Sequence, residues 1–197
     1  MKNHIFSQNL NGLNLVTIGG GNGLSTLLSG LKGFVEESKV EPVWIEKLSA
    51  IVAVSDDGGS SGRLRDELQI LAPGDIRNCM VALSEDSLLL SKLFKHRFSG
   101  NGELGGHSFG NLFLAALTEI TGDFSEAVKL SSEILASKGS IYPATMEDVR
   151  LVAELENGET IYGETNIGKM GNSIRRLRLE PEQCHPLPET IDAIYEA

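Results

Sequence analysis

The chain has 197 residues, 41% of them hydrophobic, which is enough to bury one sizeable core. A formal net charge of −10 and a pI of about 4.9 argue against broad contact with the phosphate backbone of a nucleic acid. No apolar run approaches the roughly 20 residues of a membrane span, and the first residues lack the apolar centre of a secretory signal. Two cysteines, Cys79 and Cys184, indicate neither a disulfide framework nor a four-ligand zinc site. A reduced, cytoplasmic setting is therefore expected.

The first predicted elements are a strand over residues 13–18 and a helix over 22–33, joined by a glycine-rich loop. The loop consists of Gly19, Gly20, Gly21, Asn22 and Gly23. Glycine adopts the positive φ angles of a sharp turn at low cost, and free N–H groups at a helix start attract anions. We therefore predict a phosphate site, with Ser25 as a hydroxyl donor, against the alternative of a tight turn without a ligand. The pattern is neither a complete dinucleotide fingerprint nor a P-loop.

A second predicted strand, residues 48–54, ends in an Asp-Asp-Gly-Gly loop and is followed by a short helix. In a parallel sheet both loops lie at the carboxyl ends of their strands, where α/β folds bind ligands. Asp56 and Asp57 cannot both point into one cleft without a cation or a shared proton, and carboxylates beside a phosphate favour Mg²⁺. The pair is therefore a candidate metal site; alternatively, one accepts ribose hydroxyls while the other caps the next helix. Further ligand-binding candidates are Ser60, Ser61 and Arg63.

A third motif begins a predicted helix that runs from Pro73 to about Leu83, with Asp75 as its capping candidate. Arg77 and Asn78 follow within one turn. Arg77 suits bidentate binding of a phosphate. An N-cap followed by a solvated helix face explains the same residues equally well.

A fourth motif follows a predicted helix over residues 87–98 and a glycine-rich loop over 100–106. The predicted helix 107–121 starts with His107 and Ser108, and Asn111 lies one turn on. This is a second helix start suited to an anion, and His107 is a candidate acid, base or hydrogen-bond donor. Asp123 is predicted to cap a helix over 124–137.

From about residue 141 the pattern changes to short strands. Runs at 149–155 and 160–163 flank Asn157-Gly158, a strong hairpin signal, and 174–179 would add a third strand. We therefore predict a β insertion over 141–180 in a single α/β domain, followed by a final helix over 188–196. Residues 163–169 have the glycine and lysine spacing of a P-loop, but Met170 replaces the Ser or Thr that would hold Mg²⁺, so no nucleoside triphosphate site is predicted there.

In this order, the motifs resemble the bacterial gluconeogenesis factor branch of the 2-phospho-L-lactate transferase-like family. The resemblance is carried by residues 19–23, 54–65, 73–78, 106–112, 143–145 and 163–167. It implies a Rossmann-like three-layer α/β/α fold with a mainly parallel sheet and a small β-hairpin insertion. Because family members are usually longer, with a further strand and a Gly-Pro-Gly-Ser loop, the C-terminal part of the family fold is expected to be missing.

The resemblance also implies a function. Archaeal relatives transfer a phospholactyl group from a nucleotide-activated donor with Mg²⁺. The bacterial branch is associated with growth on gluconeogenic carbon sources, with cell shape, and with binding of nucleotide sugars such as UDP-N-acetylglucosamine. A nucleotide-sugar-binding regulatory protein is therefore expected, with a Mg²⁺-dependent transferase or a purely structural domain as alternatives. Asn166, in the last motif, is a further ligand-binding candidate, and Asp57 and His107 are the catalytic candidates if turnover occurs. The sequence does not determine whether the chain forms a homo-oligomer.

Overall fold

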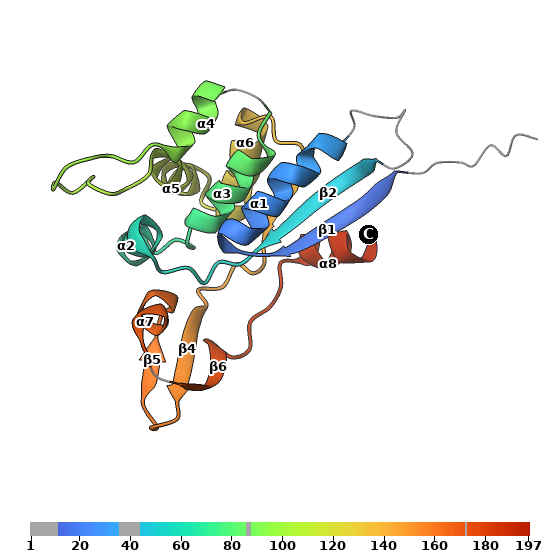
Figure 1. Cartoon of the computed structure of the whole chain (residues 1–197). Coiled ribbons are helices and arrows are strands. Elements are labelled where there is room, and N and C mark those ends of the chain that lie inside the picture. Colours follow the sequence, from blue (N-terminus) through green and yellow to red (C-terminus); the bar gives the residue numbers. More distant parts are fainter. Residues whose placement is uncertain (1–11, 36–43, 86–87, 172) are drawn as a thin grey trace, which may run out of the picture.

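The computed structural model describes residues 12–35, 44–85, 88–171 and 173–197 (Figure 1). Part of the predicted connection at 34–47 and the predicted helix start at Ser87 lie outside these residues. Within the described ranges, no helix combines the length and the apolar character that a membrane crossing requires.

A three-stranded parallel sheet forms the centre of the molecule. Its strands are β1 (Leu13–Gly19), β2 (Ile45–Val52) and β3 (Ser140–Pro143), in the order β1-β2-β3. The prediction that the first two strands are adjacent and parallel is confirmed, with Ile18 opposite Ile51. The prediction that both are buried was wrong for β1, in which Thr17 is buried but Leu13 and Ile18 are exposed. β2 is buried from Leu48 onward, as a parallel strand covered on both faces should be.

Helices cover both faces of this sheet, which confirms the expected three-layer α/β/α arrangement (Figure 1). On one face lie α1 (Gly21–Leu31), with the short η1 (Lys32–Phe34), and α3 (Gly74–Leu83), whose buried Ile76 and Met80 belong to the same core as Leu48 and Val52 of β2. α8 (Pro188–Tyr195) lies across the other face, where Asn14 of β1 donates a hydrogen bond to the carbonyl oxygen of Glu196.

Four further helices extend the first layer. They are α2 (Gly59–Leu68), α4 (Leu88–Lys95), α5 (Phe109–Thr121) and α6 (Phe124–Ile134). Phe94 of α4 packs edge-on against Phe109 of α5, with ring centroids 5.9 Å apart. The predicted cap of α6 is confirmed, because Asp123 accepts a hydrogen bond from the N–H of Glu126 at 2.7 Å.

The small antiparallel sheet is also confirmed, but its predicted start was wrong. It consists of β4 (Arg150–Leu155), β5 (Thr160–Tyr162) and β6 (Ile174–Glu180), in the order β5-β4-β6. The predicted insertion at 141–180 included residues 141–143, which belong to β3 and pair with β2 in the main sheet. Because Ile141 is buried opposite Ala50, this short run serves the central core. A helix that was not predicted, α7 (Glu164–Lys169), follows β5.

Candidate functional site

The predicted motifs lie together where the first turns of α1, α2, α3 and α5 meet, at the carboxyl ends of the parallel strands. Asp75 of α3 accepts a hydrogen bond from the N–H of Gly21 in α1 at 2.7 Å. The side-chain amide of Asn111 in α5 donates to the hydroxyl oxygens of Ser60 and Ser61 in α2, at 3.1 and 3.5 Å. Motifs that are far apart in the sequence therefore form one polar cluster.

The glycine loop has the backbone that its composition predicts. Gly20 is the extended N-cap residue of α1, no side chain caps the helix, and Gly21 has a φ of +63°. A β-carbon on Gly20 would come within 2.8 Å of a carboxylate oxygen of Asp75. The hydroxyl of Ser25 already has a partner within the helix, because it donates a hydrogen bond to the carbonyl oxygen of Asn22 at 3.1 Å. Gly19 ends β1, and Asn22 and Gly23 are exposed in the first turn of α1, where N–H groups lack partners within the helix.

The prediction that Asp75 caps its own helix was wrong. The N-cap residue of α3 is Pro73, and Asp75 lies in the first turn, where its side chain reaches across to Gly21. Burial, followed by the negative charge of Asp56, raises the pKa of the Asp75 carboxyl, while the Gly21 N–H and Arg77 act in the opposite direction. The protein thus places a carboxylate of its own at the start of α1, where an anion is favoured.

Asp56 and Asp57 face different partners. Asp56 accepts a hydrogen bond from the N–H of Gly58 at 2.9 Å, and its other oxygen would lie 2.9 Å from a β-carbon on Gly74 at the start of α3. Asp57 accepts a hydrogen bond from the N–H of Thr165 at 2.8 Å, so it caps α7. One alternative was that an aspartate of the pair caps the next helix, α2, and Asp57 does not do so. Within the described ranges, no group of three or more His, Cys, Asp or Glu side chains is arranged to hold a metal ion. Joint binding of Mg²⁺ by the pair stays a prediction.

Glu164, at the start of α7, adds a further carboxylate to this side of the cluster. Burial is the main reason why the pKa of the Glu164 carboxyl is raised, and the charges of Asp56, Asp75 and Asp57 raise it further. Three aspartate carboxylates therefore act on Glu164 across the same space. A cation, or the hydroxyl groups of a ligand, would relieve that repulsion.

His107 and Ser108 were predicted to lie in the first turn of α5. In the structure both precede the helix, which begins at Phe109. Ser108 is the N-cap residue, because its hydroxyl accepts a hydrogen bond from the N–H of Asn111 at 3.2 Å. His107 is 4% exposed, and its Nδ1 lies 3.0 Å from the hydroxyl oxygen of Ser60. Burial lowers the pKa of His107, and the positive charge of Arg63 lowers it further. A neutral imidazole that can accept or donate one proton is therefore favoured at this position.

Arg77 is buried, so the interpretation of this turn as a solvated helix face was wrong. Its guanidinium donates to the hydroxyl oxygen of Ser108 and, at 2.6 Å, to the side-chain oxygen of Asn78. Burial lowers the pKa of Arg77. Its Nε and the Oδ1 of Asn111 are buried without a hydrogen-bond partner within the described residues. Unpaired buried polar atoms are uncommon, and here they lie in the same cluster.

Two predicted residues lie at the edge of the cluster. Arg63 is exposed and donates to the carbonyl oxygen of Gly105 at 2.8 Å, which ties α2 to the glycine-rich loop at 100–106. Asn166 is exposed on α7 and donates to the carbonyl oxygen of Tyr162 at 2.9 Å. Thr165 and Glu164, which sequence reasoning missed, reach the acidic loop because Gly163 turns the chain with a φ of +90°. In the sequence, the Gly-Glu-Thr-Asn motif at residues 163–166 was the one feature that pointed to Glu164 and Thr165 as site residues.

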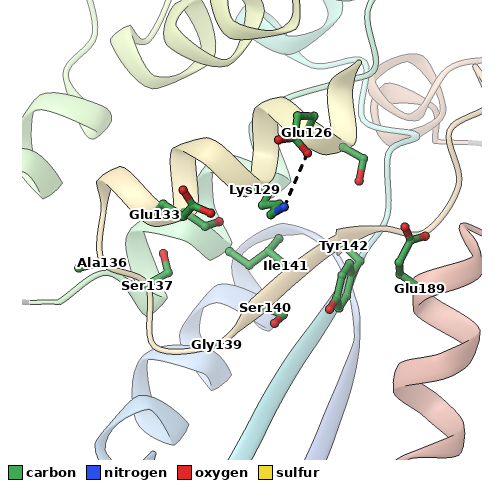
Figure 2. A pocket seen from close by; sticks show the side chains of 12 residues that line it. Glu126, Lys129, Glu133, Ala136, Ser137, Gly139, Ser140, Ile141, Tyr142 and Glu189 are labelled. Atoms are coloured by element: carbon green, nitrogen blue, oxygen red, sulfur yellow. Dashed lines mark ion pairs between the residues drawn. The ribbon is translucent and has the colours of Figure 1, made fainter. Parts of the chain in front are cut away.

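A separate hollow of about 540 Å³ lies between α6, β3 and the start of α8 (Figure 2). Its lining includes Glu126 and Lys129, which form an ion pair, and Ile141 and Tyr142 of β3. None of the predicted site residues lines this hollow. We place the candidate site at the polar cluster because helix starts, buried polar atoms and interacting carboxylates meet there.

The fold and the cluster define an α/β protein with a polar site at the carboxyl ends of its parallel strands. Residues 15–197 match the family model described as 2-phospho-L-lactate transferase CofD, and the chain belongs to this family.

Similar proteins carry a different name. The Gluconeogenesis factor of Bacillus subtilis is 51% identical, over 93% of this chain and 55% of its own length. The Gluconeogenesis factor of Halalkalibacterium halodurans is 48% identical, over 93% of this chain and 54% of its own length. A crystal structure of a protein from Bacillus halodurans matches with a TM-score of 0.83 and 48% identity, covering 92% of this chain and 56% of that chain. This chain therefore spans about half the length of the curated relatives that it matches.

His107 is expected to make stability depend on pH. Since burial lowers the pKa of His107 in the folded protein, the unfolded chain binds more protons at this residue below its ordinary pKa of about 6.5. The contribution of His107 is therefore fully present above about pH 6.5 and is lost as the pH falls through the lowered pKa of the folded state. Urea unfolding at pH 7.5 and 5.5 should show a larger loss in the wild type than in His107→Gln. His96→Gln, at an exposed position, is the control and should behave as the wild type does.

Proposed function

We propose that this chain is a nucleotide-sugar-binding regulatory protein of the gluconeogenesis factor type, which acts in the cytoplasm in growth on gluconeogenic carbon sources and in cell shape. The observation that carries the proposal is the meeting of several helix starts around one polar cluster at the carboxyl ends of the parallel strands. The similarity to proteins called gluconeogenesis factors supports the physiological part. Both cysteines are free thiols, as a reducing compartment favours.

In this proposal each part of the cluster binds a different part of the ligand. The N–H groups of Asn22 and Gly23, exposed residues in the first turn of α1, bind a phosphate. Asp56 accepts hydrogen bonds from hydroxyl groups of the sugar or ribose. Arg77 approaches the ligand with its unpaired Nε, and the Oδ1 of Asn111 receives a hydrogen bond.

A Mg²⁺-dependent transferase of the phospholactyl type is the second candidate. It is favoured by the carboxylates of Asp56, Asp57, Asp75 and Glu164, because a divalent cation would relieve the repulsion among them, and by the description of the family. In that case Asp57 and His107 are the residues to test for catalysis. Metal ions act mainly on charge that develops in the transition state, so their loss would reduce turnover more than affinity.

Replacing Gly21 by valine is expected to weaken nucleotide-sugar binding at least tenfold, while the fold persists. Gly21 has a positive φ, which a β-branched residue does not tolerate, so the first turn of α1 would have to change its path. Isothermal calorimetry with UDP-N-acetylglucosamine, with and without Mg²⁺, measures the affinity. Gly30→Val, at an open position of the same helix, is the matched control and should bind normally.

The same titrations decide between the two candidates when the ligand is recovered and analysed by chromatography. Intact ligand after prolonged incubation with Mg²⁺ supports the regulatory protein. A metal-dependent product would favour the transferase. Equal affinity of the wild type and Gly21→Val would refute a phosphate role for the glycine loop.

A further inference from the structure

A cavity of about 300 Å³ lies beside the polar cluster, between the carboxyl ends of β2 and β3 and the segment that connects β6 to α8. Its walls are mostly apolar and include Ala53, Ala144, Val149, Leu179 and Cys184. The hydroxyl-bearing residues Ser55 and Thr145 also line it. An apolar slot with a few polar groups at its rim is the usual form of a small-molecule subsite.

The outer wall of this cavity is fixed by hydrogen bonds to β3 and the residues after it. The hydroxyl of Thr145 donates to the carbonyl oxygen of His185 at 2.6 Å, and the N–H of Leu187 donates to the carbonyl oxygen of Ala144 at 3.2 Å. Glu147 accepts from the backbone N–H of His185 at 2.9 Å, and these contacts lower the pKa of the Glu147 carboxyl. Hydrogen bonds within the protein therefore hold this wall of the cavity in place.

Two residues that line the cavity, Ala53 and Ser55, lie next to the glycine loop and the acidic loop. The β-carbon of Ala53 lies 3.2 Å from the point where a side chain on Gly20 would begin. Ser55 directly precedes Asp56 in the chain. A ligand whose phosphate lies at the start of α1 is thus within reach of the cavity with its next chemical group.

The size and polarity of the cavity indicate which part of the ligand it can hold. A volume of about 300 Å³ is at the lower limit of sites that enclose a whole drug-sized ligand, so the cavity suits one part of a nucleotide sugar. A sugar carries hydroxyl groups on all sides, and burying them against apolar walls without partners would be costly. A flat heteroaromatic base buries two apolar faces and keeps its polar atoms at the edge.

We propose that this cavity is the nucleobase subsite of the ligand, with the base held between the end of β2 and the wall at residues 184–186, and with Ser55 at its polar edge. This inference rests on the proposed function and assigns a part of the ligand to a place in the fold. Cys184 lies in the wall and is half-buried, so a bound base covers its thiol.

The test uses Cys184 as a reporter in the wild-type chain. Cys79 does not interfere, because it is fully buried and burial raises the pKa of its thiol to about 12. The rate at which iodoacetamide modifies Cys184 is measured by mass spectrometry, alone and with saturating uridine diphosphate or inorganic pyrophosphate. We expect uridine diphosphate to slow the modification at least tenfold and pyrophosphate, which has no base, to leave it within twofold.

A variant that fills the cavity gives an independent measurement. Ala144→Leu is expected to weaken the affinity for uridine diphosphate at least tenfold in calorimetry, whereas Ala116→Leu, on the exposed face of α5, leaves it unchanged. Uridine diphosphate that binds by calorimetry but leaves the Cys184 rate unchanged would overturn this inference alone. Failure of every nucleotide and nucleotide sugar to bind the wild type would overturn the proposed function as well.

Discussion

Gly62→Ala is expected to lower the free energy of unfolding by about 3 kcal/mol, at the upper end of what overpacking usually costs. A β-carbon at Gly62 would lie 2.1 Å from the backbone carbonyl oxygen of Asp57 and 2.7 Å from its carbonyl carbon. Because these are backbone atoms, no side chain can rotate to make room. The start of α2 would have to move away from the acidic loop, and the hydrogen bond between the Asp57 carboxylate and Thr165 would be strained with it.

Gly30→Ala is the matched control for this substitution. Gly30 lies in α1, and a β-carbon there meets no atom within 4 Å. Alanine at an open helical position stabilises the helix by up to about 1 kcal/mol relative to glycine. Urea titrations monitored by circular dichroism should therefore move the two midpoints in opposite directions. A Gly62→Ala protein within 0.5 kcal/mol of the wild type would show that the acidic loop and α2 are not packed as described.

Arg65→Ala is expected to cost about 3 kcal/mol of stability, the lower end of the range for breaking a buried charge pair. The Arg65 side chain is almost completely buried, and its guanidinium donates to the carboxylate of Asp148 at 2.6 Å and to the carbonyl oxygen of Val149. Alanine would remove both hydrogen bonds and leave a cavity between α2 and the residues that precede β4. We take the lower end because the side chain of Asp148 is 61% exposed and is solvated after the change.

A neighbouring arginine provides the control. Arg150 pairs with Asp66 at 2.7 Å, but both side chains are substantially exposed, and exposed pairs contribute about 0–1 kcal/mol. Arg150→Ala should therefore shift the urea midpoint much less than Arg65→Ala does. Equal losses in the two variants would mean that Arg65 acts only as a surface charge.

Local patterns predicted the elements whose signal lies within a few neighbouring residues. The continuous apolar runs of β1 and β2, the Asn157-Gly158 hairpin and the cap at Asp123 all followed from residue types within a few positions. β3 was placed in the wrong sheet because a four-residue strand carries little periodicity, and its partner β2 lies about 90 residues earlier. α7 was missed because six residues are too few for a helical pattern.

The candidate site was predictable as a place but not as a set of contacts. Because carboxyl ends of parallel strands meet at one edge, the glycine loop and the acidic loop were expected at one place, and the motifs at Asp75 and Asn111 join them there. The direction of each carboxylate depends on contacts far along the chain. Asp75 bonds to a residue 54 positions away and Asp57 to one 108 positions away. Both look like local helix caps in the sequence, where short-range capping is the usual role of aspartate.

If a phosphate binds at the start of α1 as proposed, the Asp75 carboxylate at Gly21 is a tethered competitor for that position. A group that belongs to the same chain has a high effective concentration at its binding position and cannot diffuse away. Free sulfate or inorganic phosphate, with one point of attachment, competes poorly against it. A ligand that also engages the rest of the cluster gains enough binding energy to share or displace the position. In the proposed function, the resident carboxylate would therefore set a threshold that favours large phosphorylated molecules over small free anions.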